Sequence, residues 1–193
     1  MSGSAAVFLD RDGVLNELVP DPRSGAPESP LAVADVRLLP GAAAAAARLA
    51  RAGFVLACVS NQPAAAKGLV SVEELLAVHR RVIELLAGEG VELASTRLCL
   101  HHPQGVVPGL AGPCSCRKPA PGMLLDIAAA LGVDLCASWM VGDTDADVAA
   151  GRAAGCGTVL VEHPHSDHKR LSGIRPDRRA LDLAGAAAHL LGG

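Results

Sequence analysis

Short apolar runs alternate along the chain with longer segments in which apolar residues recur at helical spacing. The runs predict five strands, at 7–9, 54–59, 93–100, 138–141 and 158–161. The periodic segments predict five helices, at 41–53, 71–86, 121–131, 145–154 and 180–191. Ser71, followed three residues later by Glu74, has the spacing of a helix capping box. Because strand and helix alternate throughout, the pattern predicts an α/β fold with a parallel, doubly wound sheet.

Polar residues follow directly where three of the predicted strands end. Asp10 and Asp12 come after the first strand, Ser60 and Asn61 after the second, and Asp143 after the fourth. In an open α/β sheet, ligands bind just beyond the carboxyl ends of the strands. Each motif alone also has an ordinary interpretation, because Asp-x-Asp-Gly and Ser-Asn form turns and an aspartate can cap a helix.

Together with Lys118, these residues meet the needs of phosphoryl transfer: an in-line nucleophile, a proton donor for the leaving oxygen, and positive charge around the phosphoryl group. Asp10 can attack phosphorus, and Asp12 can protonate the leaving alcohol and later activate water. Asp10 and Asp143 can hold Mg²⁺, while Ser60 and Lys118 can bind the phosphate oxygens. Such groups in this order favour a catalytic site over a set of unrelated turns and a surface lysine.

The composition fits one compact enzyme domain. Half of the 193 residues are apolar, so we predict a single domain over 1–193. The formal net charge is −3, and the chain has no tyrosine, one tryptophan and two phenylalanines. It lacks the basic patch and the stacking surfaces that nucleic-acid binding needs. No apolar run is long enough for a membrane span, nothing resembles a signal peptide, and no dimerisation stripe is present. We expect a cytoplasmic monomer that binds a small phosphorylated substrate.

A glycine- and proline-rich loop, about 99–116, carries three cysteines and a histidine that suit a metal site. Cys99 and His101 stand at one end of the loop, and Cys114 and Cys116 at the other. Thiolates and imidazole are the ligands of a closed tetrahedral zinc site, so we expect a structural Zn²⁺ there. The single residue within each pair departs from the usual spacing of two, and reduced free thiols are the alternative.

The remaining cysteines and histidines have structural interpretations. Cys58, Cys136 and Cys156 lie in or beside apolar segments and are expected to be small core residues. His79 falls on a helix face. The histidine-rich run 163–168 predicts a polar loop, with a second metal or phosphate patch as the alternative.

Four motifs resemble, in order, those of the haloacid dehalogenase-like phosphatases: Asp10-Arg11-Asp12-Gly13, Ser60-Asn61-Gln62, Lys118, and Gly142-Asp143 with Asp147. The match spans about residues 5 to 161. Within that superfamily the chain most resembles the D-glycero-D-manno-heptose 1,7-bisphosphate 7-phosphatases and the histidinol-phosphate phosphatases. Three longer stretches carry this closer resemblance, at 9–16, 101–105 and 114–119.

The resemblance implies a Rossmann-like sheet with a zinc-binding loop insert and no large cap domain. It implies an aspartyl-phosphate intermediate on Asp10 and a Mg²⁺ ion held by Asp10, Asp143 and the backbone carbonyl of Asp12. It also favours His101 over His102 as the zinc ligand.

These features predict a Mg²⁺-dependent phosphomonoesterase that removes the C7 phosphate of D-glycero-D-manno-heptose 1,7-bisphosphate. Asn61 and Gln62, next to Ser60, are expected to bind the phosphate, and the resemblance implies that Arg117 grips the substrate. The segment 18–30 departs from the substrate-contacting segment of the enzymes that the chain resembles. Histidinol phosphate and other small sugar phosphates are alternative substrates. A non-catalytic, zinc-stabilised module that binds a phosphorylated ligand is the alternative class.

Overall fold

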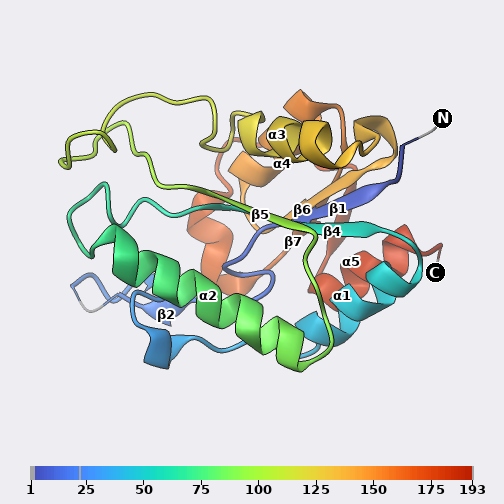
Figure 1. Cartoon of the computed structure of the whole chain (residues 1–193), viewed down its shortest axis with the longest axis horizontal. Helices are drawn as coiled ribbons and strands as arrows, with labels where there is room; N and C mark the ends of the chain where they lie inside the picture. Colours follow the sequence, from blue (N-terminus) through green and yellow to red (C-terminus); the bar gives the residue numbers. More distant parts are fainter. Residues whose placement is uncertain (1–2, 22, 193) are drawn as a thin grey trace.

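A sheet of six strands forms the centre of the molecule (Figure 1). The computed structural model describes residues 3–21 and 23–192. Every neighbouring pair of strands in this sheet is parallel, so the predicted α/β fold class is confirmed. In spatial order the strands are β5 (Ser95–Cys99), β4 (Val55–Asn61), β1 (Ala6–Leu9), β6 (Trp139–Gly142), β7 (Gly157–Val161) and β8 (Arg178–Ala180).

The direction in which successive strands are added to the sheet reverses at β1, which is therefore the topological switch point of the sheet. From β1 the chain proceeds outward through β4 to β5, and it then returns to the other side of β1 with β6 and β7. Connections leaving the central strands therefore run to opposite sides, which opens a crevice at their carboxyl ends. The backbone N–H of Asp10, directly after β1, donates to the carbonyl of Val141 on β6 at 2.9 Å. Asp10 thus lies where open α/β sheets bind their ligands.

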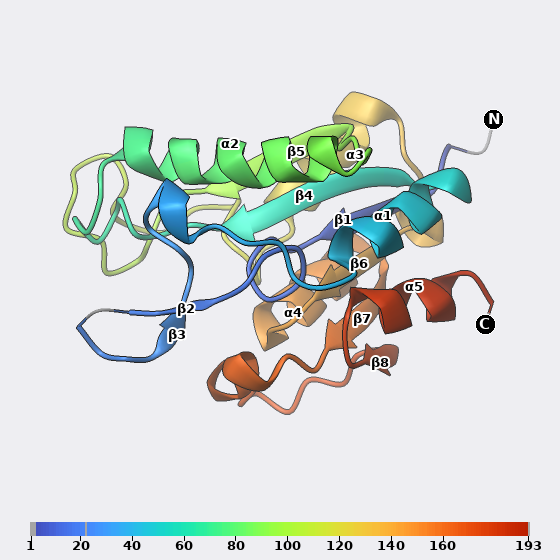
Figure 2. The same cartoon turned by 90° about the horizontal axis from the view of Figure 1, so that it is seen from below.

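Helices cover both faces of the sheet (Figures 1 and 2). Strand β1 is buried from both sides, with Val7 and Leu9 in one core and Phe8 in the other. This burial explains why the strand is apolar at every position. The first face carries α1 (Ala42–Arg51), α2 (Val72–Gly88) and α5 (Leu183–Leu190), and the second carries α3 (Gly122–Leu131) and α4 (Asp145–Ala154).

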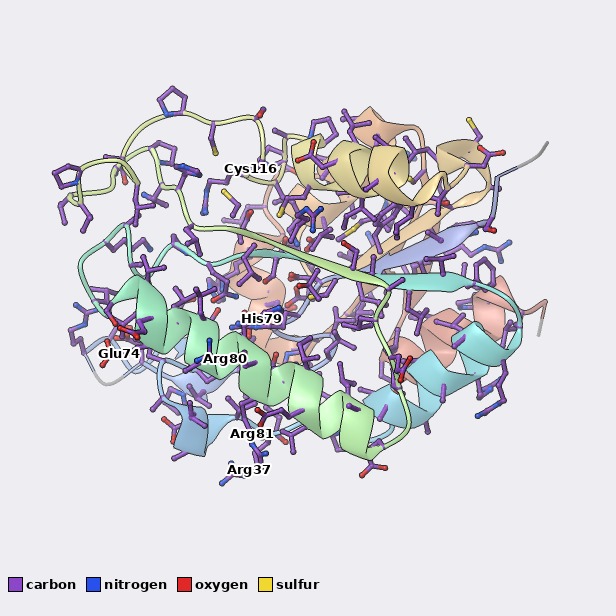
Figure 3. The ribbon with its side chains drawn as sticks, viewed as in Figure 1. Arg37, Glu74, His79, Arg80, Arg81 and Cys116 are labelled. Carbon is purple, nitrogen blue, oxygen red and sulfur yellow. The ribbon has the colours of Figure 1, made fainter. Side chains whose placement is uncertain are left out.

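Helix α2 begins at the predicted capping box. The Oγ atom of Ser71 accepts from the N–H of Glu74 at 3.1 Å, and a Glu74 carboxylate oxygen accepts from the N–H of Ser71 at 2.8 Å. His79 is buried on the inner side of the helix, whereas Arg80 is exposed (Figure 3). Burial and the nearby charge of Arg11 lower the pKa of His79 to about 4, which keeps its ring neutral near pH 7.

The segment 17–30, where the sequence pattern predicts neither a strand nor a helix, contains a short antiparallel hairpin. Its strands are β2 (Val19–Pro20) and β3 (Pro27–Glu28), and a 3-10 turn, η1 (Val33–Asp35), follows. The hairpin lies beyond the carboxyl end of the main sheet (Figure 2). Two-residue strands carry no detectable hydrophobic period, which is why the sequence pattern did not show them.

The C-terminal part of the chain corrects the prediction in two places. The segment 158–161 is not the last strand, because β8 follows it at the edge of the sheet. β8 begins with the exposed residues Arg178 and Arg179 and so lacks an apolar run. The closing helix begins at Leu183, three residues later than expected. Two further 3-10 turns are η2 (Leu135–Ala137) and η3 (Pro164–Lys169).

Among the residues that the structure describes, no large cap domain lies over the carboxyl edge of the sheet, as predicted. Between β1 and β4 the described residues form only the hairpin, η1 and α1. Within 3–21 and 23–192, no helix is both long enough and apolar enough to cross a membrane.

We expect Leu49→Ala in α1 to lower the free energy of unfolding by about 2–5 kcal/mol, because it leaves a cavity in the core between the sheet, α1 and α5. Leu49 is fully buried there. Leu181→Ala is the matched control, since Leu181 is 79% exposed and its loss should change stability by no more than about 0.5 kcal/mol. Chemical denaturation measures both, and equal effects would contradict the packing described above.

Candidate active site

Three aspartates from different elements meet at the carboxyl edge of the sheet. Asp10 follows β1, Asp143 follows β6, and Asp147 lies in the first turn of α4. One carboxylate oxygen from each lies within 4.8 Å of the other two, and all three residues are buried. The structure thus brings together Asp10 and Asp143, which the sequence placed in one magnesium site, and adds Asp147 to them.

Two glycines allow these carboxylates to pack against the backbone. A Cβ atom on Gly13 would lie 2.2 Å from Oδ2 of Asp143, and one on Gly142 would lie 2.2 Å from the Cβ of Asp147. Gly13 also has a φ of 81°, a conformation that other residues rarely adopt. The glycine of the Asp-x-Asp-Gly motif is therefore required by the space that Asp143 occupies.

Lys118 is the cation of the carboxylate cluster. Its Nζ atom lies 2.9 Å from Oδ1 of Asp10 and 2.5 Å from Oδ1 of Asp147, and it donates to the carbonyl of Val59 at 2.7 Å. Burial lowers the pKa of Lys118, but the two carboxylates outweigh burial and raise the pKa overall. The Asn61 side chain holds the Lys118 backbone, accepting from its N–H at 3.0 Å and donating to its carbonyl at 2.9 Å.

The cluster carries more negative charge than Lys118 neutralises. Burial, together with the neighbouring carboxylates of Asp147 and Asp12, raises the pKa of Asp10 to about 6, although Lys118 opposes this shift. Burial and the charges of Asp10 and Asp147 raise the pKa of Asp143 well above its ordinary value. Among the described residues, Oδ1 of Asp143 has no hydrogen-bond partner although it is buried. Excess negative charge and a free carboxylate oxygen both fit a hard divalent cation such as Mg²⁺.

The carboxylate of Asp12 lies apart from this cluster and is surrounded by donors. Arg11 donates to both of its oxygens at 2.9 and 3.0 Å, and Asn16 donates at 2.9 Å. Ser29, just after the hairpin, donates at 2.8 Å, and Gln62 donates at 2.5 Å. Burial raises the pKa of Asp12, but the charge of Arg11 and these hydrogen bonds outweigh it, so the pKa is lowered. The arrangement therefore holds Asp12 in its ionised form.

Ser60 and Gln62 are both buried at the end of β4. The amide nitrogen of Gln62 donates to Oγ of Ser60 at 3.0 Å and to the Asp12 carboxylate. Two of the side chains that were predicted to bind phosphate, Ser60 and Gln62, therefore have different roles in this structure. The Gln62 amide is directed to Asp12, while the Ser60 hydroxyl hydrogen remains available to a ligand because the Ser60 oxygen is the acceptor in this bond.

A cavity of about 290 Å³ opens over the carboxylates and Lys118. Arg117, Lys67 and Lys169 add positive charge to its lining. Arg117 donates to the carbonyl of His101 at 3.2 Å, which orients its side chain at the cavity. A second cavity of about 720 Å³ lies beside the hairpin and shares Lys67 and Glu28 with the first. A phosphate bound near Asp10 would thus have space beside it for the rest of a small molecule.

The predicted zinc ligands lie together, with Cys99 at the end of β5 and the other three on the loop that leads to α3. Figure 3 labels one of them, Cys116. The Sγ atom of Cys116 lies 3.1 Å from that of Cys99 and 3.4 Å from that of Cys114. It also lies 3.4 Å from Nδ1 of His101. Ligands of a tetrahedral Zn²⁺ with bonds of about 2.3 Å are separated by roughly 3.8 Å. The cluster is therefore compatible with zinc, and it contains His101, whereas His102 accepts from the N–H of Gln104.

The other three cysteines do not all lie in the core. Cys58 and Cys156 are buried, as predicted, but Cys136 is exposed in the turn η2. The prediction for Cys136 is wrong because the apolar residues beside it, in a 3-10 turn, do not place it on an inward face. All six cysteines are free of disulfide bonds.

The run 163–168 contacts the site, where the sequence predicted a polar loop, with a second metal or phosphate patch as the alternative. It forms η3, whose Ser166 is fully buried and donates from Oγ to Oδ2 of Asp143. Lys169 pairs with Glu28 of the hairpin at 3.1 Å. The sequence did not indicate that Ser166 would contact the site, because a single serine in a histidine-rich turn belongs to no recognisable motif. Asp147 did have a signal, since it lies four residues after Asp143 in the first turn of a helix.

A parallel α/β sheet with this carboxylate and lysine arrangement at its switch point defines a hydrolase of the haloacid dehalogenase-like (HAD-like) class. The HAD-hydrolase-like family model matches residues 115–186. Among solved structures, a D,D-heptose 1,7-bisphosphate phosphatase from B. bronchiseptica, complexed with magnesium and phosphate, is similar to this chain. Its TM-score is 0.80 at 33% sequence identity, over 97% of this chain and 98% of that chain.

The names of similar proteins give the more specific family. A D-glycero-beta-D-manno-heptose-1,7-bisphosphate 7-phosphatase from Pseudomonas aeruginosa is 38% identical over 96% of this chain and 97% of its own length. The enzyme of that name from Rhodopseudomonas palustris is 38% identical over 78% of this chain and 79% of its own length. The chain therefore belongs to the heptose-1,7-bisphosphate 7-phosphatase family of HAD-like hydrolases. This confirms the resemblance seen in the sequence and the predicted enzyme class, a phosphoric monoester hydrolase.

We expect Asp143→Asn to raise the melting temperature of the metal-free protein at pH 8. The pKa of the Asp143 carboxyl is higher in the folded protein than in the unfolded chain. At a pH above the ordinary pKa, the folded protein therefore binds this proton more tightly than the unfolded chain does, and loss of the proton at still higher pH destabilises the fold. Asp177→Asn is the matched control and should lower the melting temperature. Bonds from Thr158 at 2.8 and 2.7 Å lower the pKa of Asp177, so its charge favours folding. Melting curves in chelator measure both, and a lower value for Asp143→Asn would contradict the charge balance described above.

Proposed function

We propose that this protein is a Mg²⁺-dependent phosphomonoesterase that removes the C7 phosphate of D-glycero-D-manno-heptose 1,7-bisphosphate. The observation that carries the proposal is the buried group of Asp10, Asp143, Asp147 and Lys118 at the switch point of the sheet. Relatives that share most of the chain's length are heptose bisphosphate phosphatases by name, which supports the choice of substrate.

The reaction has two halves. In the first, an oxygen of the Asp10 carboxylate forms a bond to phosphorus, the bond from phosphorus to the C7 oxygen breaks, and Asp12 gives a proton to the leaving alcohol. In the second, Asp12 takes a proton from water, the water oxygen bonds to phosphorus, and the bond to Asp10 breaks. Phosphate leaves and both aspartates return to their starting forms.

The metal would be held by carboxylate oxygens of Asp10 and Asp143 and by the backbone carbonyl of Asp12. Bound Mg²⁺ supplies positive charge that offsets repulsion between the Asp10 carboxylate and the phosphate oxygens. Lys118 adds a fixed charge on the same side, since its ammonium contacts Asp10. Asp147 holds Lys118 in place.

Asp12 must change its contacts and take up a proton before the first half begins. Its four donors keep it as a carboxylate, which is the form that activates water. To donate a proton it must first be protonated, which requires that some of these hydrogen bonds weaken. Ser29 is the donor that lies next to the hairpin and lines both cavities. Substrate entering beside the hairpin can therefore alter the protonation of Asp12 through Ser29.

Several side chains would bind the substrate. Ser60 can donate its hydroxyl hydrogen to the phosphate oxygens, with the backbone N–H groups beside it. Arg117, at the cavity, can bind a second anionic group of a bisphosphate. Asn61 would act through the Lys118 backbone that it holds, and Gln62 through Asp12. An enzyme with these parts takes a small phosphorylated substrate.

A phosphate-release assay tests the substrate. The panel holds the α and β anomers of D-glycero-D-manno-heptose 1,7-bisphosphate, histidinol phosphate, and common sugar monophosphates and bisphosphates. We expect the highest kcat/KM for a heptose bisphosphate. A higher value for histidinol phosphate would reassign the substrate, and no release from any ester would identify a non-catalytic binding module.

We expect Asp10→Asn to abolish turnover, because an amide cannot attack phosphorus. Asp12→Asn should lower kcat by about 10²–10⁴-fold, the usual contribution of a general acid and base. Trapping of radioactive phosphate on the protein separates the two roles. With a substrate whose leaving group needs no proton, such as 4-nitrophenolate, Asp12→Asn should form the aspartyl-phosphate, whereas Asp10→Asn should not. Turnover by Asp10→Asn would contradict the mechanism.

We also propose that Cys99, His101, Cys114 and Cys116 bind a structural Zn²⁺. The support is the ligand set, whose four ligand atoms all lie within 4.8 Å of one another. Lys118 lies only two residues after Cys116. A zinc ion would therefore fix the start of the segment that delivers Lys118 to Asp10.

We expect Cys116→Ser to lose zinc and to lower the melting temperature, because a metal bound only by the folded loop adds its binding free energy to the stability of the fold. Cys136→Ser is the matched control, since Cys136 is a free, exposed thiol outside the cluster. Elemental analysis of purified protein should find one zinc per chain in the wild type and in Cys136→Ser. Equal zinc content in the Cys116 variant would contradict the site.

The enzyme is further proposed to act as a single-domain monomer in the cytoplasm. Six free thiols, with no disulfide between them, fit a reducing compartment.

A further inference from the structure

A buried serine outside the four motifs contacts a carboxylate of the proposed magnesium site. Ser166 in η3 is 0% exposed, and its hydroxyl donates to Oδ2 of Asp143. The other oxygen, Oδ1, is buried and has no partner in the described part of the chain. We propose that Ser166 is a positioning residue that sets the rotation of the Asp143 carboxylate and so makes Oδ1 available to Mg²⁺. This inference rests on the proposed function, because it assumes that Asp143 is a magnesium ligand.

The two oxygens of Asp143 have different surroundings. Oδ2 is enclosed by the Ser166 hydroxyl and by Gly13, where even a Cβ atom would lie 2.2 Å away. Turning the plane of the carboxylate away from Ser166 would lose this hydrogen bond, whereas a half turn only exchanges two equivalent oxygens. The serine therefore fixes the plane of the carboxylate, in which one oxygen faces Ser166 and the other is left without a partner. Hydrogen bonds of this kind, from residues that do not touch the metal, orient metal ligands in many proteins.

Asp143 is the member of the cluster that needs such help. Asp147 is held at both oxygens. Oδ2 accepts from the N–H and the hydroxyl of Thr144 at 3.0 and 2.6 Å, and Oδ1, which has no hydrogen bond among the described residues, forms an ion pair with Lys118 at 2.5 Å. Asp10 is held by Lys118 at 2.9 Å. Without Ser166, the described residues would offer no hydrogen-bond donor to the Asp143 carboxylate.

The backbone around Ser166 is anchored well enough to fix its hydroxyl. Arg170 donates to the carbonyls of Asp143, Val161 and His163 at 3.3, 3.3 and 3.1 Å. These bonds tie the segment to the ends of β6 and β7. The N–H of Ser166 itself donates to the carbonyl of His163 at 3.0 Å. The serine is thus placed by the same strand ends that place Asp143.

Titration calorimetry of Mg²⁺ into metal-free protein tests this role directly. Ser166→Ala should raise the Kd for Mg²⁺ by about 10-fold or more, the usual effect of losing such a partner. The Mg²⁺ concentration needed for half-maximal phosphate release should rise by the same factor, while kcat at saturating Mg²⁺ stays near the wild-type value. Ser166→Cys, whose thiol donates only weakly, carries the same test if the alanine variant does not fold.

Ser138→Ala is the matched control. Ser138 is also a buried serine, and it lies just before β6, at the opposite end of the strand from Asp143. Its hydroxyl donates to the carbonyl of Asp134 at 2.5 Å and accepts from the N–H of Ala6 at 2.8 Å. Its loss should lower the melting temperature and leave the Kd for Mg²⁺ unchanged.

An unchanged Kd in Ser166→Ala would overturn the proposal, and so would an equal rise in Ser138→Ala. Either result would leave the proposed function in place, because the wild type would still bind Mg²⁺. The calorimetric cell contains no sugar phosphate, so an error in the assigned substrate would not change the result.

Discussion

The structure depends on burying three carboxylates around one ammonium group. Asp10, Asp143 and Asp147 meet within 4.8 Å, and Lys118 contacts two of them. Like charges this close are unfavourable without compensation, which is why the pKa values of Asp10 and Asp143 are raised. The fold tolerates this cost at the switch point, where the amide of Asp10 bonds to β6 and both faces of the sheet are well packed. An unfavourable charge balance in the metal-free state is what makes the site suitable for a cation.

Residues outside the carboxylate cluster hold its charged groups in place. Lys118 is delivered by a long loop, and two features of the loop determine where its ammonium lies. The Asn61 amide holds the Lys118 backbone from the end of β4, and the Cys/His cluster gathers the loop just before it. The proposed zinc site and the proposed reaction are therefore linked through the backbone. The hairpin and η3 contact the same edge from outside the motifs, through Ser29 on Asp12 and Ser166 on Asp143.

Much of the fold could be predicted from the sequence because its signals are local. Apolar runs such as 7–9 and 54–59 are buried from both faces, so their hydrophobicity alone marks them as strands. The sharp change to Asp10, Ser60 and Asp143 at strand ends marks the carboxyl edge. By contrast, β8 and the hairpin were missed, since they are short, polar or rich in proline and are held by neighbours rather than by their own pattern. Cys136 was misplaced for a similar reason, because nothing local distinguishes an exposed turn from a core position.

The sequence by itself determined the α/β class, the four motifs and the set of groups that could carry phosphoryl transfer and bind metals. Those features depend on residue types and on spacings along the chain. Only the tertiary structure decided which groups touch. Asn61 reaches Lys118 across 57 residues, and Ser166 reaches Asp143 across 23. The tertiary structure also shows that the Asp12 carboxylate faces Arg11 and Ser29 rather than the other aspartates. Such contacts arise when strands and loops from distant parts of the chain converge at one sheet edge, and no short-range pattern records them.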